Sequence, residues 1–240
     1  MKEVRLYENV KALNKSRHAD WTMKPTTGYE FAGNTNSCFL MTVEFAKASR
    51  EYPIVFVKQD DKVFSVAVMG FRNDENLFVM ENGEWDAGYV PAYIRRYPFI
   101  PSVEDSGEVT VCIDEGFSGF SQDGIGEPLF SDEGEPGEFL KKSMDFLRDF
   151  QGQSRMTMDF CKEIEGLGLL EPMGVKVDLN NGDTFALKDF MVVNRKRLTE
   201  LKGDKVQSLL KSGGLEVIYS HLSSMTNFER LMAKIEQVAA

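Results

Sequence analysis

The sequence predicts an α+β fold, with a mainly antiparallel sheet in the N-terminal half and helices in the C-terminal half packed on one face of it. Three observations predict it. Short β-branched and aromatic runs fill the first half, apolar residues at helical spacing fill most of the second, and 240 residues can bury a sizeable core. Since no Pro/Ser-rich linker divides the chain, we expect a single domain over 1–240 that is sheet-rich at about 36–115, acidic and Gly-rich at about 100–138, and helix-rich at about 136–240.

The predicted strands follow a first segment of some thirty residues that is polar and irregular. Each strand is a run rich in β-branched and aromatic residues, and the last run alternates between β-branched residues and polar or small ones. Asp60 and Asp61 lie in a short polar turn between two of the runs, which predicts a hairpin. We expect strands at 39–45, 54–57, 63–69, 77–80 and 109–114, with a short helical turn before Tyr52.

Apolar residues at helical spacing dominate from about residue 136. Pro136 and the neighbouring acids mark a helix start, and Ser154 is a good N-cap, so we expect one helix from about 138 and a second from about 154 to near Gly168. The clearest hairpin follows at 175–187, with its turn at 180–183, and residues 190–193 extend its sheet. Two short helices then precede a long helix from Leu215 with an apolar stripe formed by Ile218, Leu222, Met225, Phe228, Met232 and Ile235.

The formal charge of −10 is concentrated in one segment. Between Arg96 and Lys141 there are eleven acidic residues, from Glu104 to Glu138, and no basic one, so the rest of the chain is close to neutral. Residues 188–211 show the opposite bias, with seven basic residues against three acidic ones. The acidic segment either binds Ca²⁺ or a basic partner, or is a solvated surface excursion, and the lack of EF-hand spacing favours the second. The overall charge argues against nucleic acid as a partner.

Several function classes receive no support from the sequence. No apolar run reaches the roughly 18–20 residues of a membrane-spanning helix, and residues 1–8 lack the apolar core of a secretory signal. Cys38, Cys112 and Cys161 lie far apart without a CxxC pair, which predicts neither a disulfide framework nor a zinc site. Gly124 and Gly126 lack the third glycine of a nucleotide-binding loop. We expect a cytoplasmic protein without metal or cofactor, while export that reads a C-terminal signal stays open.

The two histidines are the natural candidates for proton transfer. His18 lies in a polar stretch where it could hydrogen-bond a carboxylate, and His221 flanks the apolar stripe of the last predicted helix. A buried histidine at such a position is more often a satisfied core residue than a catalytic base. Because no Gly-x-Ser-x-Gly elbow is present, a Ser/His/Asp triad has no support either.

The most unusual segment of the chain is 85–99, in which five aromatic residues, two prolines and an arginine pair occupy fifteen positions. Guanidinium groups between aromatic rings could stack on them and clamp a carboxylate. That carboxylate could belong to a ligand or to the acidic segment just downstream, and an internal salt link is the simpler interpretation. The candidate binding residues of this segment are Trp85, Tyr89, Tyr93, Arg95, Arg96, Tyr97 and Phe99, and His18 and His221 complete the candidate set.

These residues also carry a resemblance to a family, since their order resembles the SapC family of bacterial proteins. The likeness covers nearly the whole chain and rests on 44–45, 51–56, 85–99, 126–134, 190–193 and the positions Leu215, Tyr219, Ser220, His221, Leu222 and Ser224. The resemblance implies an association with a paracrystalline surface layer, and it does not extend to the peptide-uptake permease of the same name. It implies no set of catalytic residues.

Three functions follow as alternatives. The first is a non-catalytic binding or accessory protein for a protein partner, such as a cell-envelope or surface-layer component, with the 85–99 segment as its contact set. The second is an enzyme or small-molecule binder whose pocket is lined by that segment, with His18 or His221 as proton carrier. The third is a structural protein that self-assembles with Ca²⁺ through the acidic segment.

Overall fold

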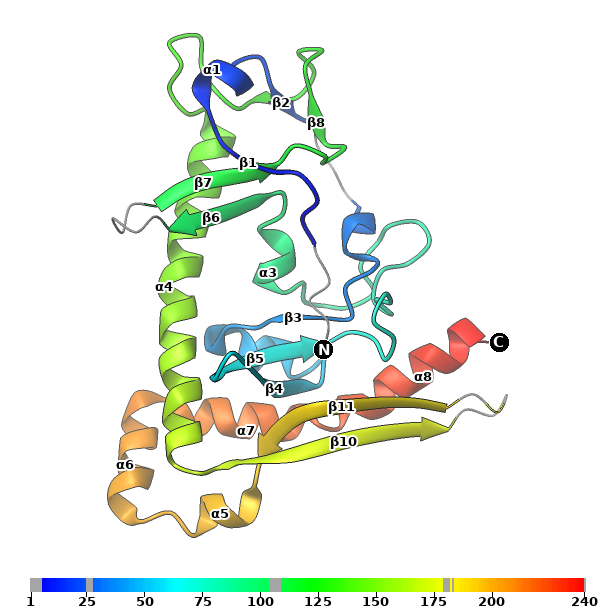
Figure 1. Ribbon diagram of the computed structural model, residues 1–240, viewed down its shortest axis with the longest axis vertical. Helices are drawn as coiled ribbons and strands as arrows, with labels where there is room; N and C mark the ends of the chain where they lie inside the picture. Colours follow the sequence, from blue (N-terminus) through cyan, green and yellow to red (C-terminus); the bar gives the residue numbers. More distant parts are fainter. Residues whose placement is uncertain (1–5, 25–27, 104–108, 179–181, 183, 240) are drawn as a thin grey trace.

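The computed structural model describes residues 6–24, 28–103, 109–178, 182 and 184–239 (Figure 1). Antiparallel strands lie mostly in the N-terminal half and helices mostly in the C-terminal half, which confirms the predicted α+β class. The largest sheet has the strand order β10-β11-β4-β5-β3, formed by β3 Ser37–Phe39, β4 Ile54–Gln59, β5 Lys62–Val68, β10 Leu170–Asp178 and β11 Thr184–Val193.

Two small sheets lie at the opposite end of the molecule from the short helices that follow β11 (Figure 1). One has the order β1-β7-β6 and consists of β1 Val10–Ala12, β7 Val109–Asp114 and β6 Phe99–Val103. The other has the order β8-β2-β9 and consists of β8 Phe120–Ser121, β2 Thr22–Met23 and β9 Glu127–Pro128. The irregular first segment and the acidic segment therefore pair with each other, and the short helix α1 Lys15–His18 lies beside them.

The predicted hairpin at Asp60 and Asp61 is formed by β4 and β5. Both aspartates have positive φ, 47° and 60°, and they make the two-residue turn that the twist of paired strands favours. The second predicted hairpin is longer than expected, because β10 and β11 pair from Leu170 to Asp178. Of its predicted turn, residues 180, 181 and 183 lie outside the described residues.

The two helices predicted between 138 and 168 are one helix, α4 Glu138–Gly166, of 29 residues. Ser154 does not cap a new helix, because its hydroxyl donates to the carbonyl of Phe150 within the same one, at 2.7 Å. Helix α4 runs along the long axis of the molecule and contacts both β6 and β5, so it joins the small sheets to the large one (Figure 1).

Three other predicted elements differ from the structure. In place of the strand predicted at 39–45, β3 ends at Phe39 and is followed by the 3-10 turn η2 Thr42–Glu44 and the helix α2 Phe45–Ala48. Residues 77–80 form only an isolated bridge between Val79 and Trp85. The long helix from 215 is two helices, α7 Gly214–Ser224 and α8 Asn227–Ala239.

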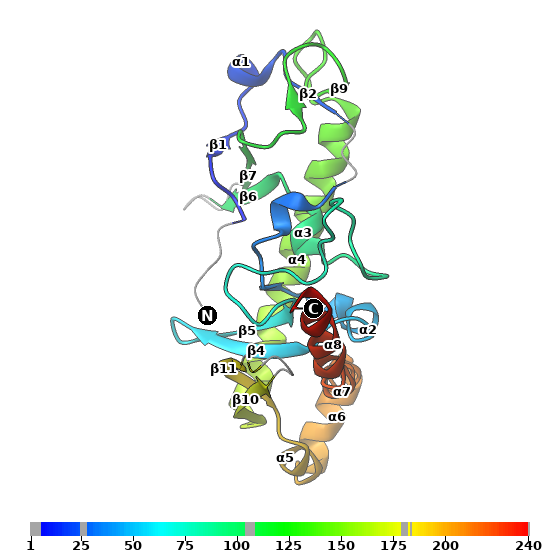
Figure 2. The ribbon, with the colours of Figure 1, turned by 90° about the vertical axis from the view of Figure 1, so that its right-hand side faces the viewer.

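Helix α7 covers one face of the large sheet, where it packs on β4 and β11 (Figure 2). It follows the short helices α5 Arg195–Thr199 and α6 Gly203–Ser212. The main hydrophobic core joins the large sheet to helices of the C-terminal half, including α4, and contains Ile54, Phe56, Ile164, Ile218 and Phe228. No helix in the described part of the chain is both long and apolar enough to span a membrane.

Candidate functional site

The 85–99 segment is held in place by a buried carboxylate that the sequence analysis missed. Glu44 is only 3% exposed, and its two oxygens accept hydrogen bonds from Met41 N, Tyr89 Oη and Ala92 N at 3.0, 2.7 and 2.7 Å. Ala92 N is the first amide of helix α3 Ala92–Arg95, so Glu44 caps this helix. Burial, together with the Glu44 carboxylate, raises the pKa of Tyr89 to about 12.

The beginning of the segment belongs to the core. The indole Nε1–H of Trp85 donates to Tyr52 Oη at 2.7 Å, and Tyr52 Oη donates in turn to the carbonyl of Tyr89. Tyr52 is fully buried and Trp85 is half-buried against the main core. Trp85 therefore positions the loop that precedes α3.

The end of the segment is buried as well. Phe99 is 3% exposed and packs in the second core cluster with Ile113. Tyr97 stacks on Phe31 with ring centroids 4.2 Å apart, and its hydroxyl donates to Asp114 Oδ2 at 3.3 Å. Burial, followed by the Asp114 charge, raises the pKa of Tyr97 well above its usual range.

The two arginines lie in the second half of the segment, where Arg95 is exposed and Arg96 is half-buried. The guanidinium of Arg95 lies over Phe146 at 5.3 Å and over Tyr89 at 5.9 Å. That of Arg96 is enclosed by the rings of Tyr93 at 4.1 Å, Phe150 at 4.8 Å and Tyr7 at 5.6 Å. We call these seven residues the arginine–aromatic cluster.

Helix α4 organises the arginine–aromatic cluster. Phe146 and Phe150 are four residues apart, so they lie one above the other on one face of α4. The guanidinium of Arg95 lies over the first ring and that of Arg96 over the second. Arg95 is exposed and donates through Nε to the carbonyl of Val90, whereas Arg96 is half-buried and donates through Nε to Tyr7 Oη. Among the described residues, neither arginine has a carboxylate within ion-pair distance.

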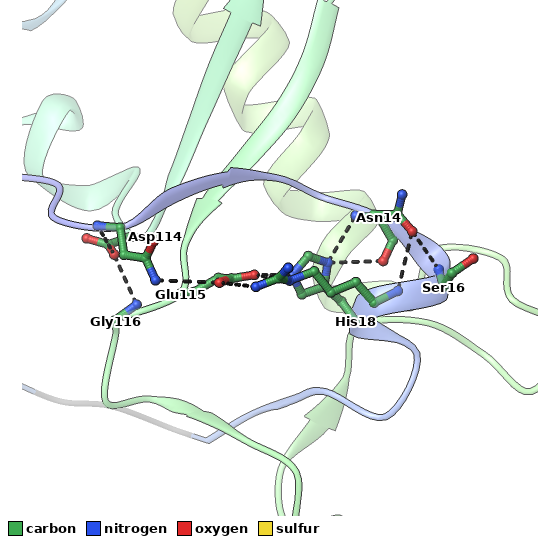
Figure 3. Close-up of polar contacts among 8 residues, drawn as sticks. Asn14, Ser16, His18, Asp114, Glu115 and Gly116 are labelled. Carbon is green, nitrogen blue, oxygen red and sulfur yellow. Dashed lines mark hydrogen bonds and ion pairs between the residues drawn. The ribbon is translucent and has the colours of Figure 1, made fainter.

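The acidic segment pairs instead with the N-terminal part of the chain. Glu115 receives two hydrogen bonds from the Arg17 guanidinium, at 2.5 and 2.8 Å, and a third contact from His18 Nε2 at 3.0 Å (Figure 3). Lys24 forms an ion pair with Asp123 at 2.9 Å. The expected salt link from the Arg95–Arg96 pair to the acidic segment is thus not made by the residues that the structure describes, and Glu104, Asp105 and Glu108 lie outside them.

Asp114 has a different environment from the other acids of that segment. It is 1% exposed and accepts the backbone N–H groups of Glu8, Asn9 and Gly116 at 2.9–3.0 Å, besides the hydroxyl of Tyr97. This carboxylate fixes the chain just before β1 to the end of β7. It is a structural acid and not part of a solvated surface.

The two histidines lie in different parts of the fold and both are fully buried. His18 is held between Asn14, whose backbone N–H donates to Nδ1 at 3.0 Å, and Glu115 (Figure 3). His221 donates from Nδ1 to the carbonyl of Ile54 at 2.7 Å and accepts the N–H of Val193 at Nε2, at 3.0 Å. It therefore connects α7 to both β4 and β11, and burial lowers its pKa to about 4.

The cysteines are free thiols. Cys38 and Cys161 are buried, and burial raises the pKa of both, that of Cys161 to about 11. Cys112 is half-buried and its pKa is also raised by burial. Among the described residues, no group of three or more histidine, cysteine or acidic side chains is arranged to hold a metal ion.

A hollow of about 470 Å³ lies between α4 and the face of the large sheet opposite α7. Of the candidate residues in 85–99, only Tyr93 is among its described lining residues, and neither histidine is. The structure therefore brings the two arginines together with Tyr89 and Tyr93, buries Trp85, Tyr97 and Phe99 wholly or partly, and leaves both histidines outside this hollow.

The residues that sequence reasoning missed had weak signals. Glu44 is a single acid within an apolar run, a position that predicts an exposed side chain in a half-buried strand. Phe146 and Phe150 have the spacing of one helix face, which predicts burial and gives no indication of which cations they meet.

A family model described as SapC matches residues 13–231 of the chain. No curated protein and no solved structure matches it.

Proposed function

The chain belongs to the SapC family, and we propose that it is a non-catalytic binding protein whose arginine–aromatic cluster holds a protein partner that presents acidic side chains. The observation that carries this proposal is the pair of neighbouring guanidiniums that lie on aromatic rings without a carboxylate from the described residues. The family resemblance suggests that the partner is a cell-envelope or surface-layer component.

The chemistry of the cluster suits an acidic partner. A guanidinium is weakly hydrated, and stacking on a ring fixes its plane while its remaining N–H groups stay available for a carboxylate. Arginine and tyrosine are also the residue types that contribute most at protein interfaces. In a chain with a formal charge of −10, two adjacent cations that have no ion pair with any described residue form a local site of opposite sign.

The roles of the histidines and cysteines support binding more than catalysis. Both ring nitrogens of His221 are bonded to backbone groups, and His18 is enclosed by Asn14 and Glu115. A general acid or base must reach its substrate, and each of these rings is 0% exposed. The thiols of Cys38 and Cys161 are buried with raised pKa values, which is the opposite of an activated nucleophile.

The test is capture of the partner from the native cell by the tagged full-length chain after cross-linking, read by mass spectrometry. Arg95→Ala should abolish capture, Arg95→Glu should do the same, and Arg155→Ala, an exposed arginine on α4 outside the cluster, should leave it unchanged. Tyr97→Ala is unsuitable, because Tyr97 stacks on Phe31 and bonds to Asp114, so its loss would destabilise the core whether or not it contacts the partner. Capture that is equal in wild type, Arg95→Ala and Arg95→Glu would refute the proposal.

A further inference from the structure

The hollow beside α4 is a second site, separate from the arginine–aromatic cluster surface. One wall is the large sheet, where the pairs Phe39↔Val66 and Val57↔Phe64 place four apolar side chains on the same face. Val55 pairs with Val66, and Val57, two residues further along β4, pairs with Phe64. Val66 and Phe64 therefore lie on one face of the sheet, together with their partners Phe39 and Val57.

The other walls come from helices. Ser154 and Met158, four residues apart on α4, face the sheet across the hollow, and Tyr93 of α3 closes one side. The opposite face of the sheet is already filled, because the ring of Phe56 lies 4.9 Å from that of His221 on α7. Phe56 and Val57 are consecutive, so their side chains point to opposite faces. The hollow is therefore on the face of the sheet opposite α7.

The side chains in the hollow are left incompletely buried. Phe39, Val57 and Phe64 are each only half-buried although they lie on the inner surface of a sheet. A bound apolar molecule would remove this area from water, at about 25 cal/mol per Å². The volume of about 470 Å³ is within the range of small-molecule sites.

The charges at the rim favour an uncharged ligand over an anionic one. The lining residue Lys58 forms an ion pair with Glu165 at 2.9 Å, and Asp189, an exposed residue with φ of 62° in β11, adds a carboxylate for which no ion pair is found among the described residues. Arg96 stacks on the ring of Tyr93 but is not one of the described lining residues. The remaining polar groups, among them Asn36 and Ser154, are neutral.

We propose that this hollow binds an uncharged, largely apolar small molecule between the sheet and α4. The proposal does not depend on the function proposed for the arginine–aromatic cluster. It concerns a different surface, which shares only Tyr93 with the cluster.

The test uses two probes with the same ring system, anilinonaphthalene, which is uncharged, and its sulfonate, which is anionic. Both become fluorescent in apolar sites. We expect saturable binding of anilinonaphthalene with one site per chain, and binding of the sulfonate that is weaker by about tenfold or more. Equal binding of the two probes would refute the uncharged class, and no binding of anilinonaphthalene would refute the site.

A matched pair of substitutions on α4 locates the probe. Met158→Trp fills the hollow, whereas Met156→Trp makes the same change at a position that is 62% exposed on the same helix. We expect Met158→Trp to weaken anilinonaphthalene binding by about tenfold or more and Met156→Trp to leave it unchanged. Should Met158→Trp fail to fold, Ser154→Leu with Met156→Leu as its control makes the same comparison. Binding that survives the filled hollow would overturn the proposal.

The two proposals fail separately in these experiments. Arg95→Ala should leave anilinonaphthalene binding unchanged, and Met158→Trp should leave capture of the protein partner unchanged. Loss of probe binding in Arg95→Ala would contradict the assignment of the probe to the hollow.

Discussion

Replacing His221 by glutamine should remove a specific part of the pH dependence of stability. In the folded protein, burial lowers the pKa of His221 from 6.5 to about 4. Between these values the unfolded chain binds a proton that the folded chain does not, so the free energy of unfolding falls as the pH falls from about 6.5 to about 4. The full effect is about 3 kcal/mol, because each pKa unit corresponds to about 1.4 kcal/mol.

The measurement is denaturant unfolding of wild type and His221→Gln between about pH 5 and pH 7.5, followed by tryptophan fluorescence. At pH 5 the protonation of His221 in the unfolded state should cost the wild type about 2 kcal/mol relative to its stability at pH 7.5. Glutamine does not titrate, so this part of the pH dependence should be absent from the variant. Groups elsewhere in the chain titrate in both proteins and cancel in the difference.

The variant should also be less stable than wild type at pH 7.5. The imidazole hydrogen-bonds to the carbonyl of Ile54 and to the N–H of Val193 at the same time, and a glutamine side chain cannot make both hydrogen bonds at once. An unsatisfied buried backbone group costs about 1–3 kcal/mol. The stability difference between the two proteins should therefore shrink as the pH falls. Parallel curves across the range would refute the assignment of His221 as a buried neutral link between α7 and the sheet.

Two further predictions concern other buried groups. In a denaturant titration, Glu44→Ala should lower the free energy of unfolding by about 3 kcal/mol, because it leaves two backbone N–H groups and a tyrosine hydroxyl without their acceptor. The control Glu200→Ala, at an exposed position, should change it by less than about 0.5 kcal/mol. In the native protein a thiol reagent should modify Cys112 before Cys38 and Cys161, which are 4% and 0% exposed, and labelling of all three at one rate would contradict their burial.

The parts of the fold that the sequence predicted are those in which local chemistry determines the structure. Asp60 and Asp61 tolerate positive φ, so the hairpin between β4 and β5 is evident from two residues and the runs that flank them. The single helix α4 could not be predicted in the same way. Ser154 is a good N-cap by type, and only the surrounding helix makes its hydroxyl bond to the carbonyl four residues earlier.

The strand expected at 39–45 shows how a tertiary contact overrides a local pattern. The apolar run there suits a strand, but Glu44 lies within it and requires buried donors. One donor is the nearby N–H of Met41, but the other two come from Tyr89 and Ala92, more than forty residues away. The chain bends into η2 and α2 so that the carboxylate can reach them, and no local signal in the run reveals this.

The candidate site was predicted in part for a similar reason. The composition of 85–99 indicated that the arginines stack on rings, and they do. Two of the rings belong to Phe146 and Phe150 on α4, about fifty residues further along, and a sequence does not show which distant rings a cation will meet. Similarly, the eleven acidic residues predict basic partners, but the sequence does not distinguish Arg17 and Lys24 from Arg95 and Arg96. The pairing of β2 with β8 and β9 brings the N-terminal part of the chain to the acidic segment, and Arg17 and Lys24 form the ion pairs.

The density of aromatic residues in 85–99 therefore has two separate causes. The first is burial in the core: Trp85 bonds to Tyr52, Tyr97 stacks on Phe31, and Phe99 is buried beside Ile113. The second is stacking on cations, since Tyr89 and Tyr93 lie against the guanidiniums of Arg95 and Arg96. Because both ends of the segment are fixed in this way, α3 is anchored on both sides, and the guanidiniums of Arg95 and of Arg96, which directly follows α3, lie over the rings of Phe146 and Phe150 on α4. Binding by a fixed cation loses less conformational entropy than binding by a free one. Under the proposed function, the buried aromatic residues of the segment contribute to binding without touching the partner, and substitution of Arg95 is expected to separate binding from stability.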